Sequence, residues 1–413
     1  MRLLSILVRQ RAGDSIWLIP VAVILALALL ALGSVALDAS RPGLHEAPFL
    51  FPGGVESSRQ FLATIATAML GAGSVVFTVT VIVVQQASTQ FSPRVLRNYL
   101  RDPIAKATLG IFAGTFIYAL IVLGSTTVVG DDDEAHRALG VTGALVLSLA
   151  STILLVIYIH HTVQSVRVVT IVQSVADETH AAIDRLFPDL AGEEERTDVT
   201  LPGATFRVVS DQEGSIVAID TAEVLHYART EDVFVEVLAQ VGDYVPRGAP
   251  LAAIHGEPSS RDAASACINE AVLLGKERTL EQDVAFGFRQ LVDIAVRALS
   301  PSTSDPATAV QVMDRIQGLL RHLGERDIPS PRYLEDDRQV RVVLPRPAWS
   351  GFVHLAFDEI IEHGRGASQL RERFHQVCDD LEDGLPASRK PDIVRHRAEL
   401  ERLARDVVIA HAS

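Results

Sequence analysis

The first 163 residues contain four long apolar stretches, whereas the rest of the chain is rich in charged residues. The stretches run from about residue 16 to 37, 61 to 84, 107 to 129 and 139 to 159. Each has roughly the 20 residues that a helix needs to cross the hydrocarbon core of a bilayer. The first and fourth have almost no polar face, unlike soluble helices of that length. The pattern predicts an α-helical membrane domain of four transmembrane helices within residues 1–163.

The first stretch has a second interpretation. Arg2, Arg9 and Arg11 precede it, and Ser34-Val35-Ala36 resembles a small-residue cleavage site, as in a signal peptide. The apolar run is long for a signal peptide, so we favour an uncleaved helix. Whether this segment is cleaved stays open.

The positive residues of the short loops predict the orientation in the membrane. The N-terminal tail, the second loop and the segment after the fourth helix are basic, whereas the third loop reads Asp131-Asp132-Asp133-Glu134. The basic residues of the second loop are Arg94, Arg97, Arg101 and Lys106. Both termini are therefore expected in the cytoplasm.

The second apolar stretch is the most polar of the four. It contains Ser74 and Thr78 and leads into Gln85 and Gln86. One interpretation, which the sequence favours, is a helix buried among its neighbours, with Gly71 and Gly73 as packing contacts. The other is a helix that lines a hydrated path, with Ser74, Thr78, Gln85 and Gln86 as pore-lining residues.

The third stretch contains Gly110 and Gly114 at the GxxxG spacing that supports helix association, followed by Tyr118, which we expect to pack or to form a hydrogen bond. No charged residue lies near the middle of any stretch. That argues against a proton relay or an ion-coupled transporter, which normally needs an ionisable group inside the membrane.

The remainder of the chain predicts a cytoplasmic α+β region. Residues 164–200 indicate a juxtamembrane helix, continuing from the fourth span to about Leu186, and an acidic linker. Period-2 patterns at 214–220, at 232–238 and into Ile254 predict a small β domain over 201–258. Residues 242–251 resemble the first hairpin of biotinyl-lipoyl-like barrel-sandwich domains, so a β-sandwich is expected. No lysine lies between Lys106 and Lys276, which excludes attachment of biotin or lipoate there.

Residues 259–413 predict a mainly helical domain with one short strand at 338–344. Arg289, Asp293 and Arg297 are spaced so that one carboxylate lies between two guanidinium groups on one helix face. Asp305 is suited to cap a helix that begins at Pro306. The simpler interpretation is a surface ion ladder and a capped helix-turn-helix. The alternative is a site or subunit contact built on these residues.

Composition narrows the classes of function. The net charge is −14 at pH 7 and the cytoplasmic part has no Lys/Arg cluster, so nucleic acid is not an expected partner. The two cysteines have no CxxC spacing, which argues against a disulfide framework or thiolate metal site. We find no phosphate-binding glycine loop, HExxH, nucleophile elbow or ligand cluster. We therefore expect neither an enzyme nor a metal or cofactor.

Two stretches resemble a known family. Residues 85–102 read QQASTQFSPRVLRNYLRD, and residues 286–315 read FGFRQLVDIAVRALSPSTSDPATAVQVMDR. They resemble the signature stretches of bacterial predicted membrane proteins labelled domain of unknown function 2254. The resemblance implies a multipass protein of the bacterial plasma membrane and no particular activity. The family usually has Asn-Asp-Pro where this chain has Ser304-Asp305-Pro306. The residues singled out for coupling or interface roles are Ser92, Arg94, Arg97, Arg101, Arg289, Asp293, Arg297 and Asp305.

Two functional hypotheses follow. The first is an oligomeric channel or pore in the lipid bilayer, a homo-oligomer with a cytoplasmic regulatory domain. The alternative is a membrane-anchored scaffold or sensor whose cytoplasmic domain binds a protein or small-ligand partner. The basic loop at residues 92–101 and the block at residues 289–305 are predicted to lie on the same side of the membrane. If the protein couples the membrane to the cytoplasm, we predict that this junction does so.

Overall fold

The computed structural model describes residues 17–40, 49–90, 102–127, 138–165, 167–189, 203, 206–328, 332–336 and 339–412. The chain divides into two compact units. The described residues up to Arg167 form the membrane unit, and those from Val168 onward form the C-terminal unit.

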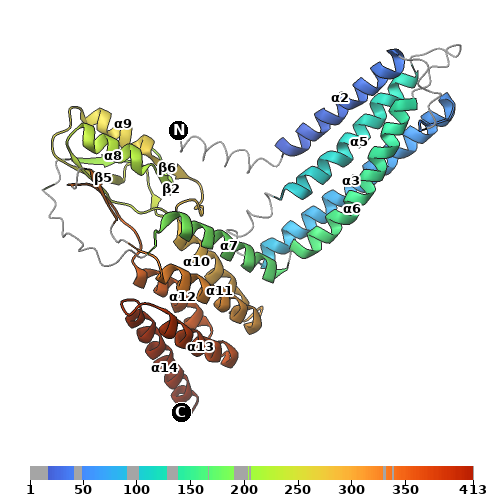
Figure 1. The fold of residues 1–413 in the computed structure, drawn as a ribbon. Helices are drawn as coiled ribbons and strands as arrows, with labels where there is room; N and C mark the ends of the chain where they lie inside the picture. The colour runs from blue at the N-terminus through green and yellow to red at the C-terminus, as the bar shows by residue number, and fades with distance from the viewer. Residues whose placement is uncertain are drawn as a thin grey trace. The chain divides into compact units, whose positions relative to one another are not determined.

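The membrane unit consists of the four helices that the sequence predicts. They are α2 (Leu18–Ser40), α3 (Val55–Gln90), α5 (Pro103–Thr127) and α6 (Ala138–Ser165). All four are long and apolar enough to cross a bilayer, and they lie side by side (Figure 1). Helix α5 is the most buried of the four and packs against α2, α3 and α6. The core of this unit includes Leu62, Met69, Phe112, Tyr118, Val122 and Tyr158.

Two features of the sequence explain how α5 packs. A Cβ at Gly110 would lie 2.9 Å from the Pro20 Cα, and one at Gly114 would lie 2.6 Å from a Leu27 methyl. The GxxxG pair therefore brings α5 close to α2, as this motif does in other membrane helices. Tyr118 is buried, and its hydroxyl donates to Ser34 Oγ at 3.1 Å. The expected roles of all three residues are confirmed.

The C-terminal unit begins with α7 (Val168–Leu186), a helix separate from α6, which ends at Ser165. Apolar residues Ile171, Val172, Val175 and Ile183 are buried along one face of α7, which packs against α10 (Val284–Leu299) and α11 (Pro306–Gly324). A side chain at Gly287 of α10 would collide with Thr179 of α7. The predicted juxtamembrane helix is therefore present, divided from the fourth span near residue 167.

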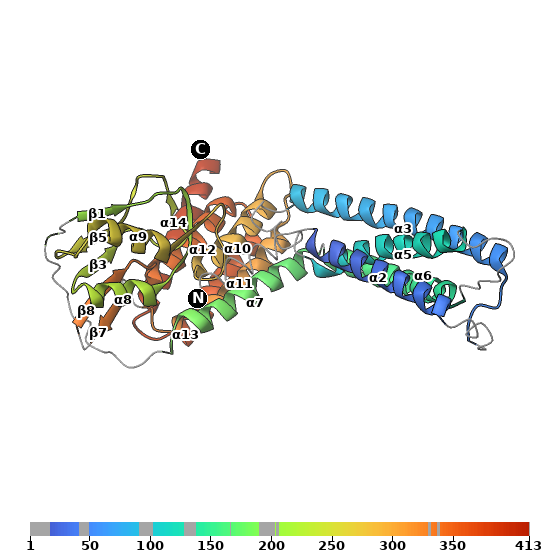
Figure 2. The ribbon, with the colours of Figure 1, turned by 90° about the horizontal axis from the view of Figure 1, so that it is seen from above.

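Strands of this unit form two small sheets. The larger has the order β1-β5-β3-β8-β7, which can be followed in Figure 2, and the smaller has the order β4-β2-β6. The strands are β1 (Phe206–Val209), β2 (Gly214–Ile219), β3 (Phe234–Val237), β4 (Tyr244–Val245), β5 (Pro250–His255), β6 (Val272–Gly275), β7 (Arg332–Asp336) and β8 (Gln339–Leu344). Most neighbours are antiparallel, but β3 and β8 pair in parallel, with Val235 opposite Val342.

The expected β-sandwich is not confirmed. Helices α8 (Thr221–Thr230) and α9 (Arg261–Ala271) contribute Val224, Ala228, Ala264 and Ile268 to the same apolar core as the strands. The apolar side of the strands is therefore covered in part by helices. In addition, β6, β7 and β8 come from outside the predicted range of 201–258, so the described residues of 259–413 contain three strands where one was predicted.

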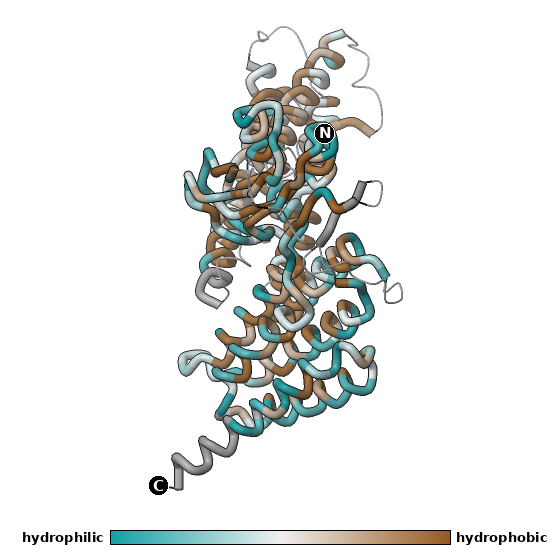
Figure 3. Tube along the Cα trace, turned by 90° about the vertical axis from the view of Figure 1, so that its left-hand side faces the viewer, coloured by the Kyte–Doolittle hydropathy of each residue, from teal (hydrophilic) through white to brown (hydrophobic). Residues whose placement is uncertain are grey.

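The rest of the unit is helical, with α12 (Trp349–His363), α13 (Ser368–Gly384) and α14 (Lys390–Ala412) following β8. Helices α10, α11, α12 and α13 pack on one another, and α14 contacts α12 and α13. Apolar and polar positions alternate around the helices that lead to the C-terminus in Figure 3. This is the pattern of amphipathic helices with one buried face.

Candidate functional site

The exposed side of the membrane unit is mainly aliphatic on α2 and α6, although α6 also exposes Thr152. Both helices expose large aliphatic side chains, which suit contact with lipid tails. They include Leu25, Leu29, Leu30 and Leu32 on α2, and Val146, Leu149, Ile153 and Val156 on α6.

Helix α3 differs, because its exposed face carries a line of small and polar residues. We name this line the polar seam. It consists of Gln60, Thr64, Thr67, Gly71, Ser74, Thr78 and Gln85, all exposed on the membrane unit. The members follow one another at alternating steps of four and three residues, and Val81 occupies the one apolar position in this series. Such a step keeps residues on one helix face over many turns.

The hydroxyls of the seam bond to their own helix. Thr64, Thr67, Ser74 and Thr78 donate to the carbonyl four residues earlier, at 2.7 to 3.1 Å. A hydroxyl oxygen keeps acceptor capacity after donating one such bond. At Gly71 an added Cβ would meet no described atom within 4 Å, so the backbone is open there. The seam therefore presents hydroxyl oxygens and unshielded backbone to any lipid or protein that contacts this face of α3.

The structure separates the two interpretations of the second span. Ser74, Thr78 and Gln85 lie on the exposed face, whereas the opposite face is buried at Leu62 and Val76 and half-buried at Thr80. Thr80 shares a 2.6 Å hydrogen bond with Tyr158 of α6 and is a packing residue. Gly73 faces Phe112 Cβ at 3.6 Å, in agreement with a packing contact, whereas Gly71 does not have one. The side chain of Gln86 lies outside the described residues.

Two polar contacts hold the ends of the membrane helices, and sequence reasoning missed both. Asp38 at the end of α2 accepts from the backbone N–H groups of Leu139 and Gly140, at the start of α6. A carboxylate is favourable at a helix N-terminus. Arg59 donates to the carbonyl of Thr126 at 2.6 Å, near the end of α5. The signal that was available is an acidic or basic residue just beyond the end of a predicted apolar stretch.

The predicted ion ladder on α10 is present in part. Arg289 Nε donates to Asp293 Oδ1 at 2.7 Å, as the spacing predicts. The other two nitrogens of Arg289 donate to the carboxylate of Glu359 on α12, a partner that the spacing could not show. The bond to Glu359 raises the pKa of Arg289, so the guanidinium stays charged. The group joins α10 to α12.

Asp305 caps α11, as expected. It accepts from Thr308 N at 3.1 Å and from Thr308 Oγ1 at 2.7 Å, and Pro306 begins the helix. These bonds lower the pKa of Asp305. Ser304 has φ of 48°, in the left-handed region. The remaining coupling candidates, Ser92, Arg94, Arg97 and Arg101, lie outside the described residues.

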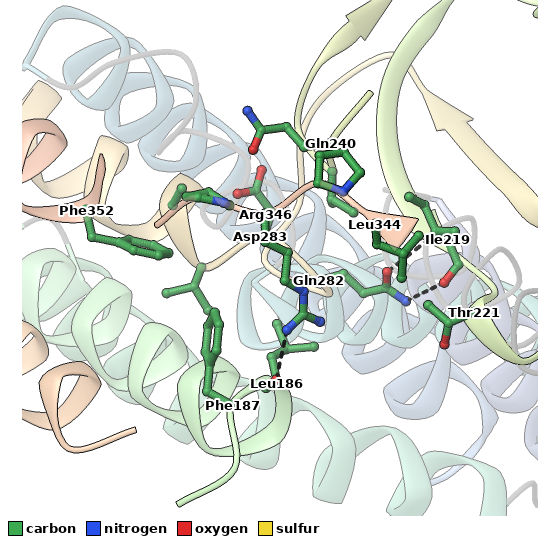
Figure 4. Close-up of a pocket in the computed structure, with 15 residues that line it drawn as sticks. Leu186, Phe187, Ile219, Thr221, Gln240, Gln282, Asp283, Leu344, Arg346 and Phe352 are labelled. Carbon is green, nitrogen blue, oxygen red and sulfur yellow. Dashed lines mark hydrogen bonds between the residues drawn. The ribbon is translucent and has the colours of Figure 1, made fainter. Parts of the chain in front are cut away.

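A pocket of about 50 Å³ lies within the C-terminal unit (Figure 4). Three of its polar side chains, those of Gln282, Asp283 and Arg346, already have partners. Gln282 bonds both the N–H and the carbonyl of Ile219, and Arg346 donates to the carbonyl of Leu186 and lies over the ring of Phe187. Asp283 is 5% exposed; its burial raises its pKa, although Arg278 opposes the shift through a 2.9 Å bond. The pocket therefore lies at a packing contact between sheet and helices and is not a preformed ligand site.

Comparison with known proteins identifies the family of this chain. The model of the family described as "Predicted membrane protein (DUF2254)" matches residues 13–380. The chain belongs to the DUF2254 family. It is 32% identical over 326 residues to the "Uncharacterized protein Rv1290c" of Mycobacterium tuberculosis strain H37Rv and to the "Uncharacterized protein Mb1321c" of Mycobacterium bovis. The match covers 76% of this chain and 62% of each relative, so the chain spans less than two thirds of their length. No solved structure matches.

One of the two stretches that carried the DUF2254 resemblance is described throughout. Residues 286–315 form most of α10, the turn after it and the first half of α11. The Ser304-Asp305-Pro306 segment provides the left-handed residue, the cap and the first helical residue in succession. Asn is one of the few residues other than Gly that adopt φ near +50° readily, which explains why Asn suits this position in the family.

Proposed function

We propose that this DUF2254 protein is an oligomeric channel in which the polar seams of several α3 helices line a shared aqueous path. The observation that carries the proposal is the position of the seam on the uncovered face of α3. From the loop charges, we place the protein in the bacterial plasma membrane with both termini in the cytoplasm and the C-terminal unit as its regulatory domain.

The physical argument concerns where polar groups are tolerated. The exposed faces of α2 and α6 are mainly aliphatic and suit lipid, but the seam sets the hydroxyls of Thr64, Thr67, Ser74 and Thr78 and the bare backbone at Gly71 along one face of α3 at membrane depth, where acceptor oxygens without partners are unfavourable in hydrocarbon. Facing other α3 helices around a symmetry axis would give the seam amides and hydroxyls water or partners. The seam spans α3 from Gln60 to Gln85, which is long enough to cross the core.

The seam also limits the kind of transport. Residues 60–85 contain no Asp, Glu, Lys or Arg. A path lined by hydroxyls and amides can hydrate a passing ion, but it lacks the ionisable group on which coupled transport depends. A passive channel is therefore favoured over a pump or coupled carrier.

Cysteine accessibility tests the proposal at matched depth. Ser74→Cys and Thr78→Cys lie in the seam, whereas Val75→Cys and Phe77→Cys lie at the same depth on either side of it, at positions that are 51% and 58% exposed. In reconstituted liposomes, a membrane-impermeant methanethiosulfonate reagent is expected to modify the two seam cysteines and to spare the two controls. In planar bilayers, the same reagent is expected to reduce the single-channel conductance of the seam variants.

The oligomeric state provides a second test of the proposed channel. Gly71→Cys is expected to form disulfide-linked dimers on oxidation in the membrane, because Gly71 is open on the seam. Cross-linking at Gly71 without modification of Ser74→Cys or Thr78→Cys would indicate a dry helix interface in place of a pore. A protein that is monomeric and never conducts would contradict the channel and favour the membrane-anchored scaffold or sensor.

A further inference from the structure

Three potential metal ligands converge on the outer side of the C-terminal unit. His354 and Asp358 lie one turn apart on α12, and His396 comes from α14. One ligand atom from each residue lies within 4.8 Å of the other two. We propose that His354, Asp358 and His396 bind one divalent transition-metal ion of the zinc type.

The ligand atoms lie close to the spacing that a metal requires. Asp358 Oδ1 lies 2.9 Å from His396 Nε2, and Asp358 Oδ2 lies 3.1 Å from His354 Nδ1. In a tetrahedral zinc site with bonds of about 2.0–2.1 Å, neighbouring ligand atoms are about 3.3 Å apart. The two histidines contact different oxygens of Asp358, so small side-chain movements that bring both nitrogens and one carboxylate oxygen to this spacing would admit the ion.

The Nδ1 atom of His396 is already held by the backbone. Its Nδ1 lies 2.8 Å from the carbonyl oxygen of Asp392, which can only accept a hydrogen bond. Nδ1 therefore carries a proton, and the other ring nitrogen, Nε2, points at the Asp358 carboxylate, so a metal ion would take the place of the proton that this contact shares. Histidines that bind metals commonly donate their second N–H to a backbone carbonyl in this way.

Burial and charge agree with this assignment. His396 is fully buried against Phe357, whereas His354 and Asp358 are 46% and 51% exposed, so an ion can reach the cluster from solvent. Two neutral imidazoles and one carboxylate form a ligand set typical of Zn²⁺ and related ions, and water would take the fourth position. Mg²⁺ and Ca²⁺ prefer ligands that are all oxygen.

One neighbouring residue, Arg395, disfavours the binding of a cation. Arg395 Nη2 lies 3.3 Å from His354 Nε2 and 2.6 Å from Asp392 Oδ1. When His354 binds a metal through Nδ1, its Nε2 must carry the proton and can no longer accept from Arg395. The exposed Arg395 would then keep only its bond to Asp392. Removal of this positive charge should strengthen cation binding.

Sequence patterns did not predict this site, because its histidines lie on different helices and form no local motif. Since α12 and α14 each supply a histidine, the bound ion would tie the C-terminal helix to the rest of the unit. Metal binding to the folded state alone raises the unfolding temperature.

Titration of the full-length protein in detergent, without a histidine tag and after treatment with a chelator, tests the proposal. We expect one Zn²⁺ per chain and, with Co²⁺ as the spectroscopic probe, the visible absorption of a four-coordinate ion. His354→Ala and Asp358→Asn should each weaken Zn²⁺ binding at least about tenfold, since even second-shell changes commonly cost that much. Both positions are exposed, so the variants should fold.

Two further variants make the result specific. His363→Ala removes another exposed histidine of α12 and should leave the affinity unchanged. Arg395→Gln should strengthen binding, an effect that a merely structural His–Asp contact would not produce. The proposal is overturned if the wild-type protein fails to bind Zn²⁺ at micromolar concentration, or if His354→Ala binds as well as the wild type.

Discussion

Arg289 on α10 donates hydrogen bonds from both of its terminal nitrogens to the two carboxylate oxygens of Glu359 on α12. The same guanidinium also bonds Asp293, which is 12% exposed. One cation therefore neutralises two carboxylates where two helices meet. Removal of one partner from such a half-buried group leaves the others poorly compensated.

We therefore expect Arg289→Ala to lower the free energy of unfolding by about 1–3 kcal/mol. Arg289→Lys should recover only part of this loss, because an ammonium group cannot bond both oxygens in parallel. Thermal unfolding of the full-length protein in detergent measures the effect, with Arg365→Ala, an exposed arginine beyond α12, as the control. Equal unfolding temperatures for Arg289→Ala and the control would show that the ladder is only a surface feature.

The glycine pair of α5 predicts a graded loss of stability. At Gly110 an added methyl group would meet the backbone of Pro20, which cannot move without shifting α2. At Gly114 it would meet the side chain of Leu27, which can change rotamer. Gly110→Ala should therefore lower the unfolding temperature more than Gly114→Ala. Gly124→Ala on the same helix, where an added Cβ would meet no described atom within 4 Å, is the control and should have little effect.

The cap at Asp305 predicts a stability that depends on pH. Asp305→Ala should cost about 1 kcal/mol at neutral pH, since α11 loses the acceptor for its first N–H groups. The bonds from Thr308 lower the pKa of Asp305 in the folded state. The contribution of its charge is therefore complete above the unfolded pKa, near 3.9, and is lost as the pH falls through the lowered folded value. Asp305→Asn keeps a side-chain acceptor at the cap but removes its charge. The difference in the free energy of unfolding between this variant and the wild type should therefore shrink as the pH falls.

The turn before this cap predicts a stabilising substitution. Ser304 adopts φ of 48°, which disfavours residues other than Gly and Asn. Ser304→Asn should raise the free energy of unfolding by up to about 1 kcal/mol. Ser302→Asn is the control, because Ser302 is not among the described residues with positive φ. If Asn raised the free energy of unfolding equally at both positions, the effect would come from Asn in general and not from the backbone conformation of Ser304.

Cys378 on α13 is expected to react only after unfolding. Burial raises its pKa to about 12, so the reactive thiolate is scarce at pH 8. Its modification by a water-soluble thiol reagent should follow the unfolding transition in denaturant. Rapid labelling of Cys378 in the native protein would contradict its burial. Slow labelling would let the cysteine scan of α3 proceed without replacing this residue.

The candidate functional residues show how far local patterns reach. Ser74, Thr78 and Gln85 were identified from composition, since hydroxyls and amides are conspicuous in an apolar span. Their shared exposure was not predictable, because it depends on which face of α3 is covered by α5 and α6. Glu359 and the cluster of His354, Asp358 and His396 left no local signal, because their members come from helices distant in sequence.

The sequence by itself determined the features that depend on near neighbours. Four apolar stretches of sufficient length specified the spans, period-2 alternation specified β2, β3 and β5, and Asp305-Pro306 specified the start of α11. Only the tertiary structure decided which surfaces meet. It paired β8 with β3, covered the strands with α8 and α9 where a β-sandwich was expected, and left the polar seam of α3 uncovered. The physical reason is that hydrophobic length, strand alternation and capping act within a few residues, whereas pairing and burial depend on long-range packing that no local pattern encodes.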